Sequence, residues 1–575
     1  MALLAWAVKP TKAASSGGSQ NPPIEFISYN MVSSFTTKTV ALSSVATALV
    51  VYQAPQLLPE RLSRAVLRFL IYDAAIAIFY TVFIYPFVVD PLRRLPGPRS
   101  YNFLYGNGLA SFSKPPGQEI LNWVNDPQIE TPEGLIRFRG FFNRSTLVPT
   151  SVEALKSVLS DHTYDFIKPP EVSDFLTLII GNGLILTEGD VHKFQRKNTM
   201  PAFQLKSLKE LYPVFWSKTR GLVEGIEADI DHLTNKESNK EPVIEFGEWA
   251  TRVTLDIIGV AGMGRDFNAI KNADDELVQA YTILLDPTIE KAIYFAMNII
   301  GPQNLVQKLP WRQNSELKRV TGQLKSYCLT NVREKREEFR KTGKLGKDIL
   351  SLLIESNNFS DQELVDQMLT FLAAGHETTS SAMTWAVWLM ATHPDWQDQL
   401  RAEVRDALPS MQSDEIPTVA QIEDLPILNA VVNETLRLYP TVPMTVRKAI
   451  RDTHIGSTAV PSGSRVLLVP WAINRSTHLW GEDSEVFKPE RWLAEGCANT
   501  GGAKSNYAQI TFLHGPRSCI GMGFSKAEFK CLLAGVVGAF DLKMSDPNEK
   551  VWPAGVITTK PAHGMHLKMK RLQGW

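Results

Sequence analysis

Cysteine is scarce in this chain. Its 575 residues include four cysteines, with no Cys-x-x-Cys pair and no dense spacing. This pattern excludes a disulfide framework and gives no support to a structural zinc knuckle. The thiols of Cys328, Cys497, Cys519 and Cys531 are therefore expected to face a reducing compartment. Cys519 is unusual because it lies among glycines, a proline and an arginine, rather than in an apolar helix or strand.

Net charge is also absent, because 60 basic and 60 acidic residues balance. A chain without an overall field is not drawn to nucleic acid, so no nucleic-acid partner is expected. The first 60 residues lack the basic start, compact apolar run and cleavage site of a short secretory signal, and they are predicted to form a tail. Apolar residues make up 44% of the chain and charged residues 21%, so a large globular core can form.

Charges are nearly missing from one long apolar run, Ala65–Val89, which contains only Arg68 and Asp73. As a helix its 25 residues would extend about 37 Å, which is enough to cross a bilayer. Tyrosines within it and arginines after it are typical of interface anchoring, but basic residues on both sides leave the orientation open. A buried core helix is the alternative. The shorter run Val40–Tyr52 could lie in the interface, form half of a hairpin, or stay outside the membrane.

The sequence predicts three parts in order: a tail over 1–60, a transmembrane anchor with its flanks over 61–94, and one catalytic domain over 95–575. The boundary is placed at Leu95-Pro-Gly-Pro-Arg99, because two prolines around a glycine stop a helix and stiffen the chain. No repeats or low-complexity linkers interrupt the last part, which favours one large domain.

Helical periodicity dominates this domain, for example over Leu205–Leu233 and Gln313–Thr342. Short β-like runs occur between Thr453 and Pro470, around Pro461-Ser-Gly463, and predict a small sheet. The predicted fold class is therefore mainly α with small β-sheets (α+β).

A helix of about 33 residues is predicted from a Ser-x-x-Glu capping box at Ser360 to Pro394. It is apolar nearly all round and is expected to thread the domain centre. Within it, Ala374–Thr379 breaks local rules. Gly375 lowers helix stability by about 1 kcal/mol, and a buried Glu377 needs a hydrogen-bonding partner. Such violations often mark function; a glycine for close packing and a glutamate that reaches solvent are the alternative.

A second helix, entered at Pro426 and ending before Pro440, carries Glu434 and Arg437 on one face. Isolated Glu-x-x-Arg pairs are common and usually solvated. This helix is apolar enough that the pair is expected to be buried and to need a third partner, for which Arg491 is the candidate.

The turn around Cys519 has features of a cofactor site. The helix that follows is expected to point its N-terminus at the sulfur, which would lower the pKa of the thiol, and thiolates bind metals. Gly515 and Gly521 remove side chains so that a flat, bulky cofactor can approach the backbone. Arg517 supplies a cation for cofactor carboxylates. A lone catalytic thiolate is the alternative, with only His514 nearby to pair with it.

The stretch from Phe512 to Gly521 reads Phe-x-x-Gly-x-Arg-x-Cys-x-Gly and, at every fixed position, resembles the haem-binding signature of the cytochrome P-450 monooxygenases. Three further elements resemble that family and follow its order: the oxygen-activation turn at Ala374–Thr379, the Glu434 and Arg437 pair, and Phe487–Trp492. The resemblance covers about residues 95 to 570. The apolar span followed by Leu-Pro-Gly-Pro resembles the microsomal branch, and the sequence style resembles fungal members of secondary metabolism.

This resemblance implies haem b (iron protoporphyrin IX), with Cys519 as the axial ligand of the iron and Phe512, Gly515, Arg517 and Gly521 around the cofactor. It also implies a cytochrome P-450 fold with a long central distal helix and a proximal cysteine loop.

One departure concerns Gly189-x-x-His192-x-x-x-Arg196, which stands where many members have Trp and Arg against the haem propionates. Because His192 and Arg196 share a helix face, propionate binding is expected in altered form. Arg447 resembles a further propionate-binding arginine.

The implied activity is that of an NADPH- and O₂-dependent monooxygenase, an oxidoreductase that takes electrons from NADPH through the flavoprotein NADPH–cytochrome P-450 reductase. Glu377 and Thr378 would relay protons, and Glu434, Arg437 and Arg491 would be structural. Lys526 and Lys530 are a candidate docking face for the reductase; solubility alone is the other explanation.

The substrate is expected to be a lipophilic small molecule, because the candidate pocket walls are almost all apolar. These walls are Phe166–Ile185, Leu369, Phe371, Ala373, Ala374 and Thr441–Val446. The alternatives are a haem-thiolate isomerase or dehydratase, a fatty acid or xenobiotic hydroxylase, and a non-catalytic haem protein. The expected location is a single-pass membrane protein of the endoplasmic reticulum with the catalytic domain in the cytosol.

Overall fold

The computed structural model of the chain describes residues 35–53, 62–99, 102–103, 105–236, 241–272, 288–555 and 557–575. It divides the chain into two compact units, Met1–Tyr80 and Thr81–Trp575. Of the predicted tail over residues 1–60, residues 1–34 and 54–60 lie outside the described residues.

The smaller unit contains two helices, α2 (Phe35–Gln53) and α3 (Leu62–Phe79), which pack against each other. The run Val40–Tyr52 is therefore helical. Among the described residues, one helical stretch, Leu67–Val89, is long and apolar enough to cross a membrane by length and composition. This matches the predicted apolar helix over Ala65–Val89.

The end of this apolar stretch differs from a regular α-helix. Tyr80–Val89 (η2) is π-helical and contains Pro86, which has no N–H to donate to the helix ladder. The amide of Asp90 instead donates to the carbonyl of Tyr85 at 2.8 Å, five residues earlier. The larger unit begins in this stretch because its last turns are hydrogen-bonded to the first strands; for example, Arg137 Nη2 donates to Asp90 Oδ2 at 3.2 Å.

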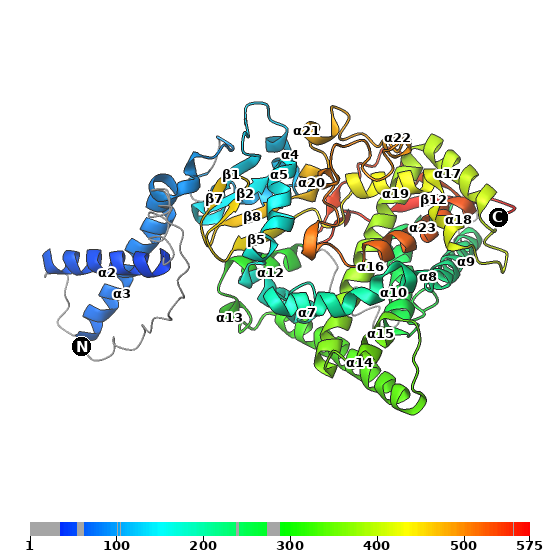
Figure 1. Ribbon diagram of the computed structural model, residues 1–575, viewed down its shortest axis with the longest axis horizontal. Helices are drawn as coiled ribbons and strands as arrows, with labels where there is room; N and C mark the ends of the chain where they lie inside the picture. Colours follow the sequence, from blue (N-terminus) through cyan, green and yellow to red (C-terminus); the bar gives the residue numbers. More distant parts are fainter. Residues whose placement is uncertain are drawn as a thin grey trace, which may run out of the picture. The chain divides into compact units, whose positions relative to one another are not determined.

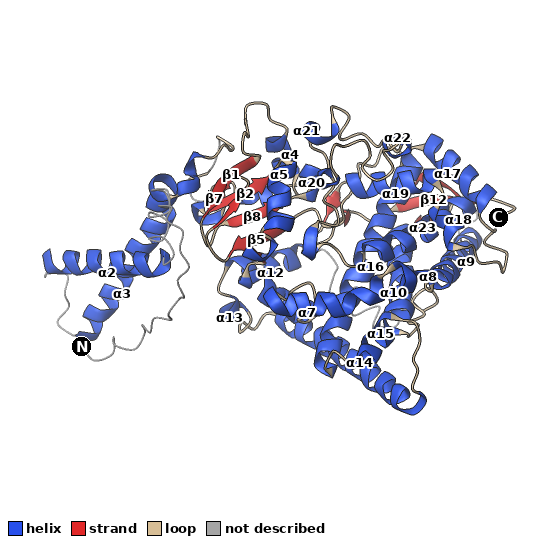
Figure 2. Ribbon diagram, viewed as in Figure 1, coloured by secondary structure: helices blue, strands red, loops and turns tan. Residues whose placement is uncertain are grey.

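Helices make up most of the larger unit, as Figure 2 shows. The longer ones are α6 (Pro170–Ile180), α7 (Gly189–Thr199), α9 (Tyr212–Lys236), α10 (Phe246–Met263), α12 (Ile289–Ile300), α14 (Arg312–Thr342), α15 (Ile349–Ser356), α16 (Asp361–Thr392), α17 (Pro394–Ala407), α19 (Pro426–Leu438) and α23 (Met522–Ala539). The shorter ones include α4 (Gln118–Val124), α5 (Val152–Lys156), α8 (Leu205–Lys209), α13 (Gln303–Val306), α18 (Val419–Glu423), α20 (Pro470–Ile473), α21 (Thr477–Trp480) and α22 (Glu490–Leu493). The predicted fold class, mainly α with small sheets, is confirmed.

The strands form small sheets, the largest in the order β1-β2-β8-β5-β3. Its strands are β1 (Leu135–Arg139), β2 (Ser145–Pro149), β3 (Phe166–Ile167), β5 (Thr445–Ala449) and β8 (Arg465–Leu468), and β2 pairs with β8 in parallel. The other sheets are β4-β12-β9 (Val243–Glu245, His566–Arg571, Phe540–Met544), the hairpin β6-β7 (Thr453–Ile455, Thr458–Val460) and the hairpin β10-β11 (Pro553–Ala554, Lys560–Pro561). The predicted sheet over Thr453–Pro470 therefore splits: β6 pairs with β7, whereas β8 pairs with β5 and with β2, which lies over 300 residues earlier.

The capping box at Ser360 begins α16 as predicted. Ser360 Oγ accepts from the amide of Glu363, and the Glu363 carboxylate accepts from the amide of Ser360 at 2.8 Å. The helix then runs through the middle of the larger unit to Thr392, where Pro394 prevents its continuation (Figure 1). Its neighbours include α10, α14 and α23.

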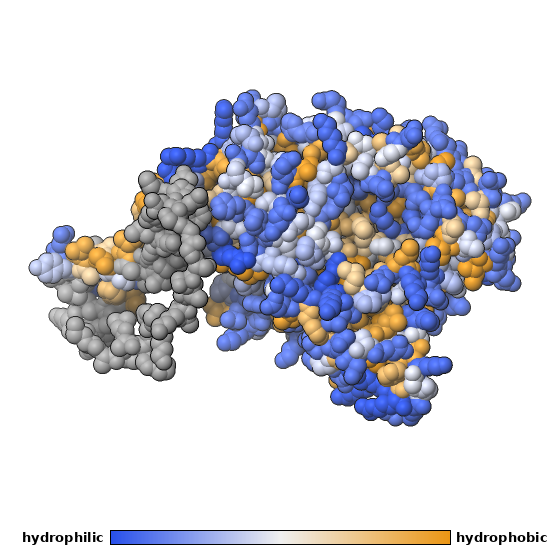
Figure 3. All heavy atoms as spheres, in the orientation of Figure 1, coloured by the Kyte–Doolittle hydropathy of each residue, from blue (hydrophilic) through white to orange (hydrophobic). Residues whose placement is uncertain are grey.

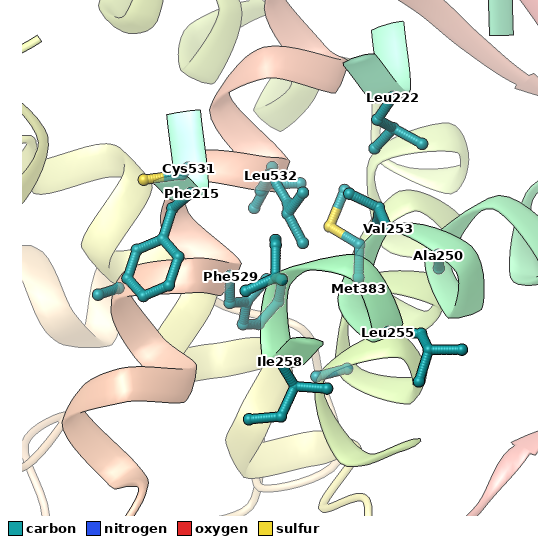
Figure 4. Close-up of a cluster of buried hydrophobic side chains, with 14 of the residues drawn as sticks. Phe215, Leu222, Ala250, Val253, Leu255, Ile258, Met383, Phe529, Cys531 and Leu532 are labelled. Carbon is teal, nitrogen blue, oxygen red and sulfur yellow. The ribbon is translucent and has the colours of Figure 1, made fainter. Parts of the chain in front are cut away.

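The main core lies where α9, α10, α16 and α23 meet. Figure 4 shows side chains from all four helices in contact, among them Phe215, Val253, Met383, Phe529 and Leu532, all of them buried. Burial of such side chains contributes about 1.5–3 kcal/mol each. The core therefore fixes α16 and α23 relative to each other, and these are the two helices on which the candidate site is built. By contrast, the visible surface of the larger unit is mainly hydrophilic, with scattered hydrophobic residues (Figure 3).

Candidate active site

The turn before α23 presents Cys519 in a fixed position. The amide of Cys519 donates to the carbonyl of Phe512 at 2.8 Å, which closes the turn. Gly515 adopts φ +70°, and a Cβ there would lie 2.1 Å from the carbonyl oxygen of Leu159. Only glycine fits at this position, because both the backbone angle and the close approach exclude a side chain.

The Cys519 thiol is accessible to solvent, although the surrounding protein desolvates it. Burial raises the pKa of the thiol, while the backbone N–H of Gly521 and the guanidinium of Arg196 oppose part of that rise. The sequence predicted a lowered pKa from the following helix, and this is wrong for the protein alone, because desolvation outweighs the Gly521 N–H and the Arg196 guanidinium. A thiolate at Cys519 therefore depends on a bound metal, which deprotonates a coordinating thiol.

Basic side chains gather beside this turn. We call Lys168, His192, Arg196, Arg447 and Arg517 the basic cluster. Arg517 donates to the carboxylate of Glu188, and its Nε is buried with no hydrogen-bond partner among the described residues. Glu188 also accepts from the amide of Lys168 at 2.9 Å. The cluster thus holds several positive groups around one carboxylate.

Mutual repulsion and burial perturb these groups. They lower the pKa of Lys168 to about 7, with burial as the first cause and Arg447 as the second. They lower the pKa of His192 to about 4, through burial and then Arg517 and Arg196. Burial and Arg517 lower the pKa of Arg447 to about 10. An anion placed among them would relieve both costs.

His192 and Arg196 lie on α7, as the sequence predicted, but they make different contacts. His192 is buried and its Nδ1 lies 3.2 Å from the hydroxyl of Tyr164. Arg196 reaches the cysteine turn, where its Nη1 donates to the carbonyl of Ser518 at 2.5 Å. Sequence reasoning missed Lys168 and Glu188; Glu188 immediately precedes the helix that carries His192, which was the available signal.

The turn Ala374–Thr379 lies inside α16, which continues through it as a regular helix. A Cβ at Gly375 would lie 2.7 Å from Ile258 of α10, so this glycine serves close helix packing. Thr378 Oγ1 donates to the carbonyl of Ala374 at 2.7 Å. Ala373, Ala374 and Thr378 keep some exposed surface on a helix that is otherwise largely buried here, so α16 presents a short accessible face at this turn.

Glu377 is buried and does not reach solvent. Its Oε1 accepts from Thr558 Oγ1 at 3.0 Å, and its Oε2 lies 3.1 Å from Lys560 Nζ. Both partners belong to the C-terminal hairpin region. Sequence reasoning did not find them because nearly 200 residues separate them from α16.

The Glu434 and Arg437 pair is fully buried on α19 and is bidentate, with Nε to Oε2 at 2.8 Å and Nη2 to Oε1 at 2.7 Å. Arg491 Nε lies 3.4 Å from Glu434 Oε1, so the structure brings the three predicted residues together. The indole N–H of Trp492 donates to Glu434 Oε2 at 2.9 Å. Arg437 Nη1 also donates to the carbonyls of Asn474 and Ser484, at 2.8 and 2.5 Å.

The sequence profile of the family described as cytochrome P-450 matches residues 138–567 of this chain. The chain belongs to the cytochrome P-450 family. It is therefore a haem enzyme and an oxidoreductase of the monooxygenase type, as the sequence motifs predicted.

Several curated cytochrome P-450 monooxygenases match most of the chain. The monooxygenase sphH of Aspergillus fumigatus is 38% identical over 503 residues, covering 87% of this chain and 92% of that protein. FUM15 of Gibberella moniliformis is 37% identical over 511 residues, covering 81% of this chain and 85% of that protein. ALT8 of Alternaria alternata is 35% identical over 551 residues, covering 86% of this chain and 92% of that protein.

The residues present fit a haem group. The basic cluster offers three arginines, a partly protonated Lys168 and the neutral imidazole of His192 to the two propionates of haem b, against the single carboxylate of Glu188, and the N–H at Arg517 Nε has no hydrogen-bond partner among the described residues. Among the described residues, no group of three or more His, Cys, Asp or Glu side chains could hold a bare metal ion. A haem would bring the porphyrin nitrogens as ligands of its iron, so the protein would need to supply only the thiol of Cys519.

Two expectations of the P-450 reading are wrong in detail. Lys530 is buried and pairs with Glu423 at 2.7 Å, and Lys526 donates to Asn433 Oδ1 at 2.8 Å while burial lowers its pKa to about 8. These lysines do not form an exposed docking face. Leu369 and Phe371 pack into the main core rather than lining an accessible wall, because their side of α16 faces neighbouring elements of that core.

Proposed function

We propose that this cytochrome P-450 inserts one oxygen atom from O₂ into a lipophilic small molecule, with Cys519 as the axial ligand of the haem iron. The observation that carries the residue assignment is the basic cluster beside the Cys519 turn, since its excess positive charge matches a cofactor with two carboxylates. The relatives sphH, ALT8 and FUM15, all named monooxygenases, support the reaction type.

The bound haem would supply O₂ activation, with two electrons from NADPH delivered through a flavoprotein reductase; the second oxygen atom leaves as water. The chain holds this group through charge. Arg447, Arg517 and Lys168 would pair with the propionates, and the imidazole N–H of His192 would donate to one of them. Arg196 braces the turn through Ser518, so it positions the thiol. Phe512, Gly515 and Gly521 would shape the backbone against which the haem binds.

Proton delivery is assigned to Glu377 and Thr378 on α16. Thr378 keeps accessible surface and carries a hydroxyl, so it can hold a proton donor at the accessible face of the helix. Glu377, the residue before Thr378, is a buried carboxylate. It links the accessible face of the helix to Lys560, whose side chain reaches solvent. In the structure the hydroxyl of Thr378 donates to the carbonyl of Ala374 on the same helix. In the relay this hydroxyl would turn toward the bound substrate.

The lipophilic substrate class is supported by the accessible part of α16. Ala373 and Ala374 remain half-buried there, beside Thr378. The loop of Thr441–Val446, next in the predicted wall, is also mostly apolar and keeps accessible surface. Apolar walls with few polar groups favour an uncharged molecule. The sequence resembles fungal members of secondary metabolism, and fungal monooxygenases match it over most of their length. The proposed substrate is therefore a compound of secondary metabolism.

The location is proposed from Leu67–Val89, whose length and apolar composition suit a single-pass anchor. We place the larger unit on the cytosolic side of the endoplasmic reticulum, where NADPH and the reductase are found. Four free cysteines suit such a reducing compartment.

The test is product formation by the purified enzyme with reductase, NADPH and a panel of lipophilic compounds. Oxygenated product that carries one atom from ¹⁸O₂ is expected with at least one compound. Product that appears from a peroxide without NADPH or reductase would instead indicate an isomerase or dehydratase.

A further inference from the structure

Glu377 is held by the C-terminal hairpin rather than by its own helix. Its carboxylate lies 3.1 Å from Lys560 Nζ and accepts from Thr558 Oγ1 at 3.0 Å. The side chain of Glu377 is 8% exposed and that of Lys560 is 27% exposed. The ion pair therefore joins a buried carboxylate to a side chain that reaches water.

The hairpin cannot move freely away from α16. The carbonyl of Thr559 accepts from the hydroxyl of Ser381 and from Trp385 Nε1, both on α16. The amide of Thr559 donates to the carbonyl of Thr441 at 2.9 Å, in the loop after α19. These bonds fix the neighbouring residue, Lys560, at one position along α16.

A second helix also holds Lys560. Its ammonium lies 3.3 Å from Thr251 Oγ1 on α10, in addition to its contact with Glu377. One face of Lys560 thus bridges α10 and α16, while the rest of the side chain stays accessible. A lysine that only improved solubility would not be shared between two buried helices.

Few other titratable groups face the Glu377 carboxylate. His376 Nε2 lies 3.9 Å from Oε2, but His376 is fully buried and burial lowers its pKa, so it is neutral near pH 7. Among the described residues around Glu377, Lys560 is then the one that supplies a compensating positive charge. Removing one partner of such a pair leaves an uncompensated charge in a desolvated place.

We infer that Lys560 is a positioning residue for the oxygenation reaction: its ammonium supplies the counter-charge of the buried Glu377 carboxylate, holds it in place and connects it to solvent. The inference rests on the proposed function of Glu377 in proton delivery. No covalent bond to Lys560 changes during the reaction. Its contribution is electrostatic, and an arginine at this position retains it.

The first test reads the protonation of Glu377 directly, by infrared spectroscopy of the purified holoenzyme near pH 7. Lys560→Met is expected to create a protonated carboxylic acid absorption that wild type and Lys560→Arg lack. The Glu377→Gln/Lys560→Met double variant should lose it again. Lys560→Gln keeps a hydrogen-bond donor without charge and should also show the absorption, which covers the case that Lys560→Met does not fold. No new acid absorption in either neutral variant overturns the inference.

The second test reads coupling, as product formed per NADPH consumed. Lys560→Met should lower it several-fold with unchanged substrate binding and haem content, and Lys560→Arg should retain most of it. The double variant with Glu377→Gln should couple no worse than Glu377→Gln alone, because both changes break the same link. The matched control is Lys568→Met. Lys568 lies on β12 and forms an exposed ion pair with Glu241, so its removal should leave the product formed per NADPH unchanged.

The outcomes separate this inference from the proposed function. A wild type that forms no oxygenated product defeats the proposed function, whereas the infrared test still decides the state of Glu377. A wild type that turns over normally, together with a Lys560→Met variant that couples equally well, defeats only the role of Lys560.

Discussion

The larger unit holds two clusters of charged side chains, and they differ in one respect. In the network of Glu434, Arg437 and Arg491 each charge meets an opposite charge: Arg437 and Arg491 both approach Glu434, and Arg491 also pairs with Asp483 at 2.6 Å, although Arg491 Nε itself makes no hydrogen bond among the described residues. The basic cluster is short of negative charge: Lys168, Arg447 and Arg517 share the one carboxylate of Glu188, and Arg517 Nε has no hydrogen-bond partner among the described residues.

The difference indicates what each cluster is for. A complete network stabilises the chain by itself, and breaking it leaves a buried charge unpaired. An incomplete one costs the protein free energy until an anion joins it. The same residue type, arginine, is therefore structural at position 437 and ligand-binding at positions 447 and 517.

The largest effect on stability is expected from Arg437→Met. It leaves Glu434 buried and unpaired, so the free energy of unfolding should fall by about 3–5 kcal/mol, measured by denaturant unfolding. The Glu434→Gln/Arg437→Met double variant should recover part of the loss. If Arg437→Met were as stable as wild type, the network would not be the structural member of the comparison.

Arg447→Met should affect haem retention strongly and the stability of the haem-free protein little. It removes a buried charge that lacks a full partner, so the haem-free protein should unfold at nearly the same denaturant concentration as before. Haem retention should weaken by roughly ten- to a hundredfold, because a charge-assisted hydrogen bond contributes about 1.5–3 kcal/mol. Haem transfer to apomyoglobin measures this. A variant that loses stability as Arg437→Met does, while keeping its haem, would erase the contrast.

The pH dependence of the haem-free protein should reveal His192. Its pKa is about 4 in the folded chain, against about 6.5 unfolded, so below pH 6.5 the unfolded chain binds a proton that the folded chain refuses. Stability contributed by His192 is therefore full above pH 6.5 and should fall by about 2 kcal/mol from roughly pH 7.5 to 5. His192→Gln should flatten this part of the curve. Haem should reduce the slope, since its carboxylates favour the charged imidazole; an unchanged slope with haem would argue against propionates near His192.

The smallest structural effect is expected from Thr378→Ala, because Thr378 belongs to neither cluster. Unfolding and haem content should stay close to those of wild type, while product per NADPH consumed falls several-fold as reducing equivalents are lost to peroxide and water. Product and peroxide assays measure the split. Unchanged coupling would remove Thr378 from the proton relay.

The local parts of this architecture could be predicted from the sequence, and the long-range parts could not. The capping box at Ser360, the limits of α16 and the burial of Glu434 with Arg437 follow from spacing and apolar pattern within one segment. The partners of Glu377 come from the C-terminal hairpin, and β8 joins strands from the start of the domain; no local periodicity encodes either pairing. The pKa of Cys519 was predicted in the wrong direction because helix position is visible in a sequence and desolvation is not.

Lysines illustrate the same limit. Residue type alone predicts that Lys526 and Lys530 lie at the surface, yet Lys530 is buried against Glu423. No sequence pattern marks Lys560, although it is the partner of the buried Glu377 carboxylate on α16. Charge alone does not tell a solvated lysine from a paired one; the fold supplies the partner.

The most direct test of the account is the spectrum of the reduced, carbon-monoxide-bound protein, recorded for wild type and for Cys519→His. The account predicts a thiolate-type band in wild type and its replacement by an imidazole-type band in the variant, or loss of haem. A wild-type spectrum of the nitrogen-ligated type, or a thiolate-type band that survives in Cys519→His, would contradict the assignment of Cys519 as the iron ligand.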